Sequence, residues 1–127
     1  MTQEDKELLL KDLCARLPYK PIVQIDDCGI WDLRGVDHDD SAELRDRVIV
    51  WHGENYPSSK NSFPIINCKP YLFPLSSMTE EERIAIGNEF AYGQPQKAMD
   101  ILHKRHIDYR GIIPMGLAID ATGLNIY

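Results

Sequence analysis

The sequence predicts an α+β fold: a small bent antiparallel sheet or SH3-like barrel of four or five strands, preceded by one helix and followed by two helices and an extended tail. Three observations predict it. Leucines recur at helical spacing near the start, short apolar runs separated by polar turns follow, and helix-capping residues appear in the second half. A chain of 127 residues is long enough for one hydrophobic core, so we expect a single domain over residues 1–127.

A first helix is predicted over residues 3–16. Thr2 is the candidate N-cap, and Glu4 and Asp5 favour the positive end of the helix dipole. Pro18 ends the helix, because the residue before a proline is disfavoured in helical geometry. The helix carries an apolar stripe that must pack on another element, and its members are Leu9, Leu10, Leu13 and Leu17.

Five short extended segments are predicted in the first half of the chain, most of them separated by polar connections. Their ranges are residues 22–25, 30–36, 47–52, 63–68 and 69–74. Between the first two segments the composition is that of a tight turn. The third segment has large apolar residues on both faces, which predicts burial on both sides; these residues are Val48, Ile49, Val50 and Trp51.

Two helices are predicted in the second half. Ser77 or Thr79 caps the first, and three glutamates follow in the pattern of a capping box. Gly93 ends this helix. Pro95 begins the second helix, at a position where helices tolerate proline, and the helix continues to about Arg105.

The tail, residues 106–127, is rich in isoleucine and leucine but interrupted by glycine and proline. Such a pattern does not sustain a helix. We expect an extended chain docked on the core, with one edge strand at residues 117–119.

Composition excludes several classes of function. Asp and Glu outnumber Lys and Arg by 20 to 14, so the formal charge is -6, which disfavours nucleic acid as a partner. No apolar run reaches the length of about 18 residues that a membrane span needs, and no secretory signal opens the chain. The cysteines are odd in number and widely spaced, which predicts reduced thiols in a cytoplasmic protein without a cofactor; they are Cys14, Cys28 and Cys68.

Three blocks carry a resemblance to a known family. They are EDKELLLKDLCARLP at residues 4–18, KPYL with PLSSMTEEE at residues 69–82, and HIDYRGII with GLA at residues 106–118. Together they resemble a family of uncharacterised small proteins of gut anaerobes and of their phages and mobile elements. The resemblance implies a relative but no activity, ligand or catalytic residue, and it does not extend to residues 36–62.

Carboxylates are densest between residues 26 and 46. The alternation in residues 37–43 resembles the first half of a calcium-binding loop, but the glycine and the final glutamate of such a loop are missing. A solvated turn is therefore the favoured interpretation. The alternative is a divalent metal held by Asp37, His38 and Asp39, as in a metal-dependent hydrolase or nuclease.

A basic strip with interspersed aromatic residues occupies residues 97–110. Its candidate binding residues are Lys104, Arg105, His106, Tyr109 and Arg110. Basic side chains with stackable rings suit single-stranded nucleic acid, so a nucleic-acid-binding module is a second alternative. The favoured interpretation is structural: the basic residues and histidines complement the negative helix end, while Asp108 and Arg110 pin the tail.

The favoured function is that of a non-enzymatic small accessory protein acting through protein–protein contact. The chain lacks a nucleophile-elbow motif and a glycine-rich phosphate loop. Its acidic stretch is able to complement a basic partner. The hydrolase and the nucleic-acid-binding module remain as alternatives, and no membrane contact is expected.

Overall fold

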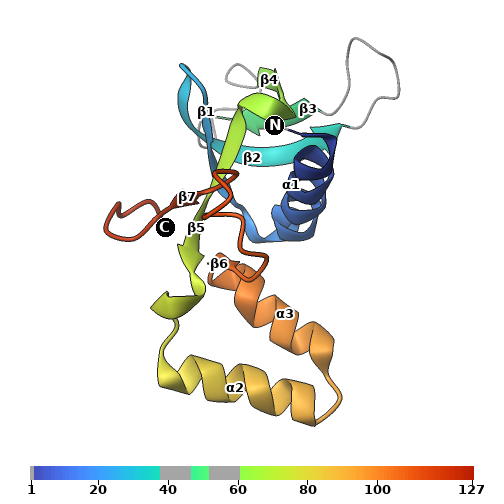
Figure 1. Ribbon diagram of the computed structural model, residues 1–127, viewed down its shortest axis with the longest axis vertical. Helices are drawn as coiled ribbons and strands as arrows, with labels where there is room; N and C mark the ends of the chain where they lie inside the picture. The colour runs from blue at the N-terminus through green and yellow to red at the C-terminus, as the bar shows by residue number, and fades with distance from the viewer. Residues whose placement is uncertain (1, 38–46, 52–60) are drawn as a thin grey trace.

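The computed structural model describes residues 2–37, 47–51 and 61–127. Within these ranges it contains three α-helices and a seven-stranded mixed sheet, so the α+β class is confirmed. Two regions are distinguished in Figure 1. We call the sheet, the first helix and the tail the body, and we call the helical hairpin of residues 80–104 the arm.

Helix α1 spans Gln3–Arg16, and Thr2 is its N-cap, as predicted. The Asp5 amide donates to Thr2 Oγ1 at 3.1 Å, and the Thr2 amide donates back to the Asp5 carboxylate at 3.4 Å. This capping box satisfies two amides that the first helical turn leaves without partners. A 3-10 turn, η1 (Leu17–Tyr19), leads on towards the sheet. The fully buried leucines of α1 are Leu9 and Leu13.

The described strands form one open sheet in the order β4-β3-β2-β1-β5-β6, with β7 also paired to β5. They are β1 (Ile22–Ile25), β2 (Gly29–Asp37), β3 (Arg47–Trp51), β4 (Asn61–Pro64), β5 (Cys68–Pro74), β6 (Ile107–Asp108) and β7 (Ile119–Asp120). All pairings among β1 to β5 are antiparallel, whereas β6 and β7 run parallel to β5. The sheet is thus mixed, and the predicted SH3-like barrel is not confirmed because the described sheet does not close.

The prediction of one strand over residues 63–68 is wrong. The chain leaves β4 at Pro64, makes the 3-10 turn η2 (Ile65–Asn67) and begins β5 at Cys68. It must turn there because β4 and β5 are separated by three other strands of the sheet. Pro64 has no amide with which to continue a ladder, and the Ile65 side chain is buried at the corner.

The tail also differs from the prediction. The edge strand expected at residues 117–119 is instead β7, where Ile119 pairs with Tyr71 of β5. A second short strand, β6, pairs Ile107 with Phe73 and was not predicted. Both pairings are long-range and only two residues long, so no local pattern of alternation marks them.

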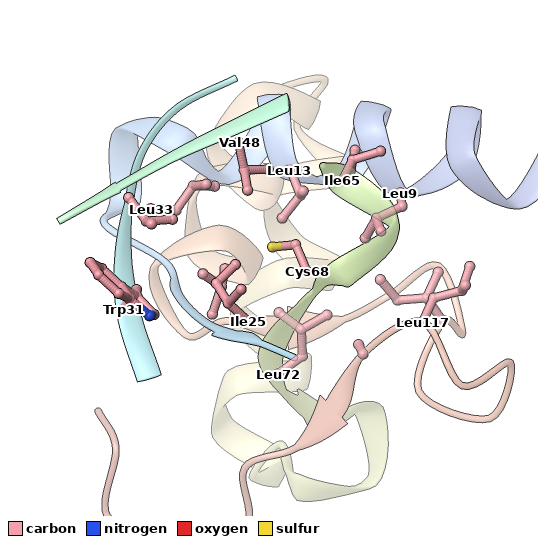
Figure 2. Close-up of a cluster of buried hydrophobic side chains, with 14 residues drawn as sticks. Leu9, Leu13, Ile25, Trp31, Leu33, Val48, Ile65, Cys68, Leu72 and Leu117 are labelled. Carbon is pink, nitrogen blue, oxygen red and sulfur yellow. The ribbon is translucent and has the colours of Figure 1, made fainter. Parts of the chain in front are cut away.

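The core of the body lies between α1, the inner face of the sheet and the tail (Figure 2). In β3, Val48 and Val50 are fully buried. Ile49 and Trp51, on the other face, are only half-buried. Burial of this strand is therefore one-sided, in contrast to the expectation of burial on both faces. The tail contributes Ile112 to the same core.

The arm packs around a second, smaller apolar cluster. Helix α2 spans Glu80–Ala91 and α3 spans Pro95–Lys104, close to the predicted bounds. Thr79 caps α2 in a box with Glu82, as the sequence predicts. The buried members of the cluster are Ile86, Ala98, Leu102 and Ile107. No helix in the described ranges combines the length and apolarity needed to cross a membrane.

Candidate functional site

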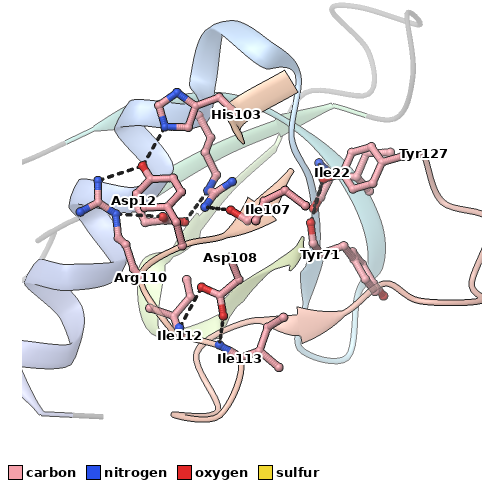
Figure 3. Close-up of polar contacts among 12 residues, drawn as sticks. Asp12, Ile22, Tyr71, His103, Ile107, Asp108, Arg110, Ile112, Ile113 and Tyr127 are labelled. Atoms are coloured by element: carbon pink, nitrogen blue, oxygen red, sulfur yellow. Dashed lines mark hydrogen bonds and ion pairs between the residues drawn. The ribbon is translucent and has the colours of Figure 1, made fainter. Parts of the chain in front are cut away.

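Three charged side chains meet where α1 contacts the tail (Figure 3). Asp12 and Arg16 lie one turn apart on α1, and both are fully buried. Arg16 Nε donates to Asp12 Oδ2 at 2.8 Å, and Arg110 Nε donates to Asp12 Oδ1 at 3.1 Å. One carboxylate thus serves two guanidinium groups, so this ion cluster carries one excess positive charge.

The remaining contacts of Arg16 attach α1 to the start of the tail. Its Nη2 donates to the carbonyl of Ile107 at 2.7 Å, and its guanidinium lies 5.1 Å from the centre of the Tyr109 ring. The third nitrogen, Nη1, has no hydrogen-bond partner among the described residues. A fully buried cation with an unsatisfied donor depends strongly on its one carboxylate, because an uncompensated buried charge is costly.

His103 of α3 is linked to this cluster through Tyr109. The Tyr109 hydroxyl accepts from Arg110 Nη2 at 3.2 Å and lies 2.7 Å from His103 Nε2. A hydroxyl has one proton and two lone pairs, so the tautomer of His103 sets which of the two groups donates in this bond. Burial, followed by the charge of Arg16, lowers the pKa of His103, which favours the neutral imidazole.

His106 occupies a second buried position, against the last residue of the chain. Its ring stacks on that of Tyr127, with centroids 3.6 Å apart and an interplanar angle of 12°. Burial, reinforced by the charges of Arg16 and Arg105, lowers the pKa of His106 to about 4. The Tyr127 hydroxyl accepts from the Ile22 amide at 2.8 Å, and burial raises its pKa to about 12.

Asp108 organises the tail. Its two carboxylate oxygens accept from the amides of Ile112 and Ile113, both at 2.9 Å, and its side chain is buried. These bonds stabilise the turn before Ile112, and the Ile112 side chain is part of the core of the body. Asp108 bonds to the tail backbone and Arg110 bonds to Asp12 of α1. These contacts fix the tail, as the structural interpretation of the sequence expects.

The predicted basic strip does not form a common face. Lys104 is exposed, and Arg105 forms an ion pair with Glu82 of α2. Beyond them, His106 adopts a left-handed backbone conformation with φ of 55°, which turns the chain out of the helix. Arg110 pairs with Asp12 of α1 and contacts Tyr109, which in turn bonds to His103 of α3. The candidate binding residues are thus distributed over several separate contacts.

The predicted metal ligands are largely outside the described residues. Asp37 is the last described residue of β2 and is exposed, while His38 and Asp39 lie outside the described ranges. Among residues 2–37, 47–51 and 61–127, no group of three His, Cys, Asp or Glu side chains is placed to hold a metal ion. The described residues enclose no pocket. Burial raises the pKa of the Cys68 thiol to about 12, which keeps it protonated.

Sequence reasoning missed Asp12 and Arg16 because an acidic and a basic residue at this spacing usually form an exposed helical ion pair. The signal that could have revealed them is their position. With Leu9 and Leu13, they make the i, i+3, i+4, i+7 stripe that α1 buries. The stripe therefore mixes apolar and charged side chains.

A second feature, the solvent-facing surface of α2, involves no buried charge. Ile84 is 54% exposed, Phe90 is 51% exposed, and Tyr92 at the end of the helix is 78% exposed. Ile86 is the one buried residue of α2. Phe90 lies one turn after Ile86 on the same side of α2, whereas Ile84 lies on the opposite side. The exposed apolar side chains of α2 therefore do not form the single stripe of an ordinary surface helix.

The charged residues of α2 are acidic except for the exposed Arg83, which directly precedes Ile84. Glu80 and Glu81 in the first turn of α2 are exposed. Glu82 is neutralised by Arg105, whose hydrogen bond is the main reason that the pKa of Glu82 falls to about 2. The open side of α2 thus combines exposed apolar side chains with two unneutralised carboxylates at one end.

Comparison of the chain with protein-family profiles, with curated proteins and with solved structures found no match.

Proposed function

We propose that the protein is a non-enzymatic binding module that presents α2 to an apolar groove, rimmed by basic residues, on a partner protein. The observation that carries the proposal is the exposure of Ile84, Phe90 and Tyr92 on one helix. The ion cluster around Asp12 and the stacked His106 are interpreted as structural.

The apolar side chains supply the affinity in this proposal. Fully burying one large apolar side chain stabilises a contact by about 1.5–3 kcal/mol, and each of these three has roughly half or more of its surface left to bury. Exposed apolar patches of this kind mark interaction sites.

The charges supply the selectivity. Glu80 and Glu81 adjoin Ile84 at the start of α2, and the whole chain carries -6. A basic rim on the partner would be attracted to both, whereas a second copy of this acidic chain would be repelled. The occupant is therefore proposed to be a different, basic protein.

The position of α2 supports the same role. In Figure 1, α3 lies between α2 and the body, so α2 stands at the end of the molecule remote from the sheet. A groove could approach it without contacting the body. The acidic stretch of residues 26–46 is the other partner-binding element that the sequence suggests, and half of its eight carboxylates lie within residues 38–46, outside the described ranges.

The proposal is tested by site-specific photo-crosslinking in cells of the source organism. A photo-reactive phenylalanine analogue replaces Ile84 in one variant of the full chain and Ile30 in another. Ile30 is the matched control because it is a 51% exposed isoleucine of the body. We expect position 84, and not position 30, to crosslink to one defined protein.

The crosslinked protein is then purified and its affinity for the chain is measured. Ile84→Ser should raise Kd by at least about tenfold, which corresponds to 1.4 kcal/mol, while Ile30→Ser leaves Kd unchanged. Equal crosslinking at both positions would contradict the proposal. A crosslink to a second copy of the chain would show that α2 mediates a homodimer, and it would contradict the proposal of a basic partner protein.

A further inference from the structure

The arm contacts the body through apolar packing on Ile107 of β6 and Phe73 of β5 and through a set of polar contacts. Their apolar clusters have no buried residue in common. Between them, the hydroxyl of Tyr19 in η1 donates to Asp100 of α3, Arg16 holds the Ile107 carbonyl, and His103 bonds to Tyr109. We call this set of contacts, together with Asp12, His106, Arg110 and Tyr127, the joint.

His106 is at the point where the chain passes from the arm to the body. Its amide donates to the His103 carbonyl in α3 at 3.0 Å. Its carbonyl accepts from the Phe73 amide in β5 at 2.8 Å, and its ring is covered by Tyr127. A change in the position or charge of the His106 ring therefore affects contacts with both the arm and the body.

The charged groups that face this ring are mostly positive. Arg16 faces it from α1 and Arg105 from the end of α3. The carboxylate nearest in the network, Asp12, is already shared by Arg16 and Arg110. The stacked Tyr127 carries its proton, so it adds no negative charge. His106 Nδ1 is buried without a hydrogen-bond partner among the described residues, so a second ring proton would be buried without an acceptor.

We propose that the joint is a proton-operated hinge, in which protonation of His106 adds a cation beside Arg16 and Arg105 and releases the arm from the body. The ring then turns into water, the Tyr127 stack breaks, and the bond from Phe73 to the His106 carbonyl is lost. The hinge concerns the contacts between the arm and the body. It does not depend on whether α2 binds a partner protein.

The direction of the pH effect follows from the shift at His106. Its pKa is about 4 when the arm is docked and about 6.5 when the ring is in water. The released form therefore binds more protons between these values. Docking is fully stable above about pH 6.5 and weakens as the pH falls towards 4. The equilibrium constant for release rises about twentyfold between pH 7 and pH 5.

Amide hydrogen exchange of the full chain, followed by NMR and corrected for intrinsic rates, tests the hinge. The Phe73 amide reports the joint, because it is bonded to the His106 carbonyl. The Leu33 amide, bonded to the Pro21 carbonyl at 3.0 Å, reports the body. We expect the protection of Phe73 to fall by about twentyfold from pH 7 to pH 5 and to stay below that of Leu33 throughout, because the arm opens while the body remains folded.

Two variants identify the group responsible. His106→Phe keeps a ring to stack on Tyr127 but does not titrate, so the change at Phe73 should disappear. His103→Gln is the matched control, because it removes the other imidazole of the joint and should leave most of the change in place.

Equal protection of Phe73 and Leu33 at pH 5 would overturn the proposal, because the arm would then open only together with the body. An unchanged pH dependence in His106→Phe would also overturn it. If that variant does not fold, the imidazole of His106 is titrated directly in the unmodified chain. A pKa below about 5 supports the hinge, and a value near that of a free histidine, about 6.5, overturns it.

Discussion

The body and the arm each contain a helix that begins with a threonine capping box, yet the two helices are stabilised differently. Helix α1 buries four side chains against the sheet and the tail: Leu9, Asp12, Leu13 and Arg16. Helix α2 buries Ile86 alone. Most helical stability in proteins comes from packing of one face rather than from intrinsic propensity. By that measure α1 is part of the core, and α2 depends on its cap and on contacts within the arm.

This difference indicates where the molecule opens first. A region with few buried apolar contacts undergoes local opening at a lower free energy than the global transition. The arm has a small cluster, an exposed outer helix and a polar joint to the body. We therefore expect the arm to open as a unit while the body remains folded, and the following predictions test this.

The largest effect is expected from truncation of a buried side chain in each region. Leu13→Ala should lower the global free energy of unfolding by about 3 kcal/mol, because it leaves a cavity beneath fully buried neighbours. Ile86→Ala should lower the protection of arm amides by about 2 kcal/mol and the global value by much less. Chemical denaturation measures the first quantity and amide exchange the second. A full loss of global stability in Ile86→Ala would show that the arm does not open separately.

A smaller effect is expected when each cap is removed. Thr2→Ala and Thr79→Ala delete chemically identical N-caps, and each should cost about 1 kcal/mol. Thr2→Ala should lower global stability. Thr79→Ala should increase exchange of α2 amides about fivefold with the body unchanged. Identical effects of the two variants on global stability would remove the distinction between the regions.

The smallest effect is expected at the ion pair between Arg105 and Glu82. Arg105 keeps the pKa of Glu82 at about 2, so the pair stabilises the arm above about pH 4.5 and its contribution is lost as the pH falls through 2. Arg105→Gln should raise the pKa of Glu82 towards its ordinary value and cost less than about 1 kcal/mol, because the pair is partly exposed. Titration of the Glu82 side chain by NMR measures this. Lys97→Gln, which removes the same charge from an exposed position in the arm, should leave the titration unchanged.

The candidate site was predicted less well than the secondary structure. The histidines and basic residues of 103–110 were singled out, but as a surface that complements a helix end or binds nucleic acid. In the structure, His103 and His106 are buried and their pKa values are lowered. Burial favours the neutral imidazoles, and the burial of His106 depends on a segment distant in the sequence, since its ring stacks on Tyr127. The exposed face of α2 was missed because Ile84 and Phe90 read as ordinary core residues of a helix.

The sequence by itself determined the elements whose signals are local. Thr2 and Thr79 define where two helices begin, Pro95 opens the third, and alternation defines β1 to β3. The tertiary structure decided what these signals do not encode: the corner at Ile65, the parallel pairing of the tail with β5, and the partners of the charged residues. Arg16 is the clearest case. At the end of a helix it has the sequence position of a solvated cation, but it is fully buried because Asp12 and the Ile107 carbonyl, 91 residues away, accept its hydrogen bonds.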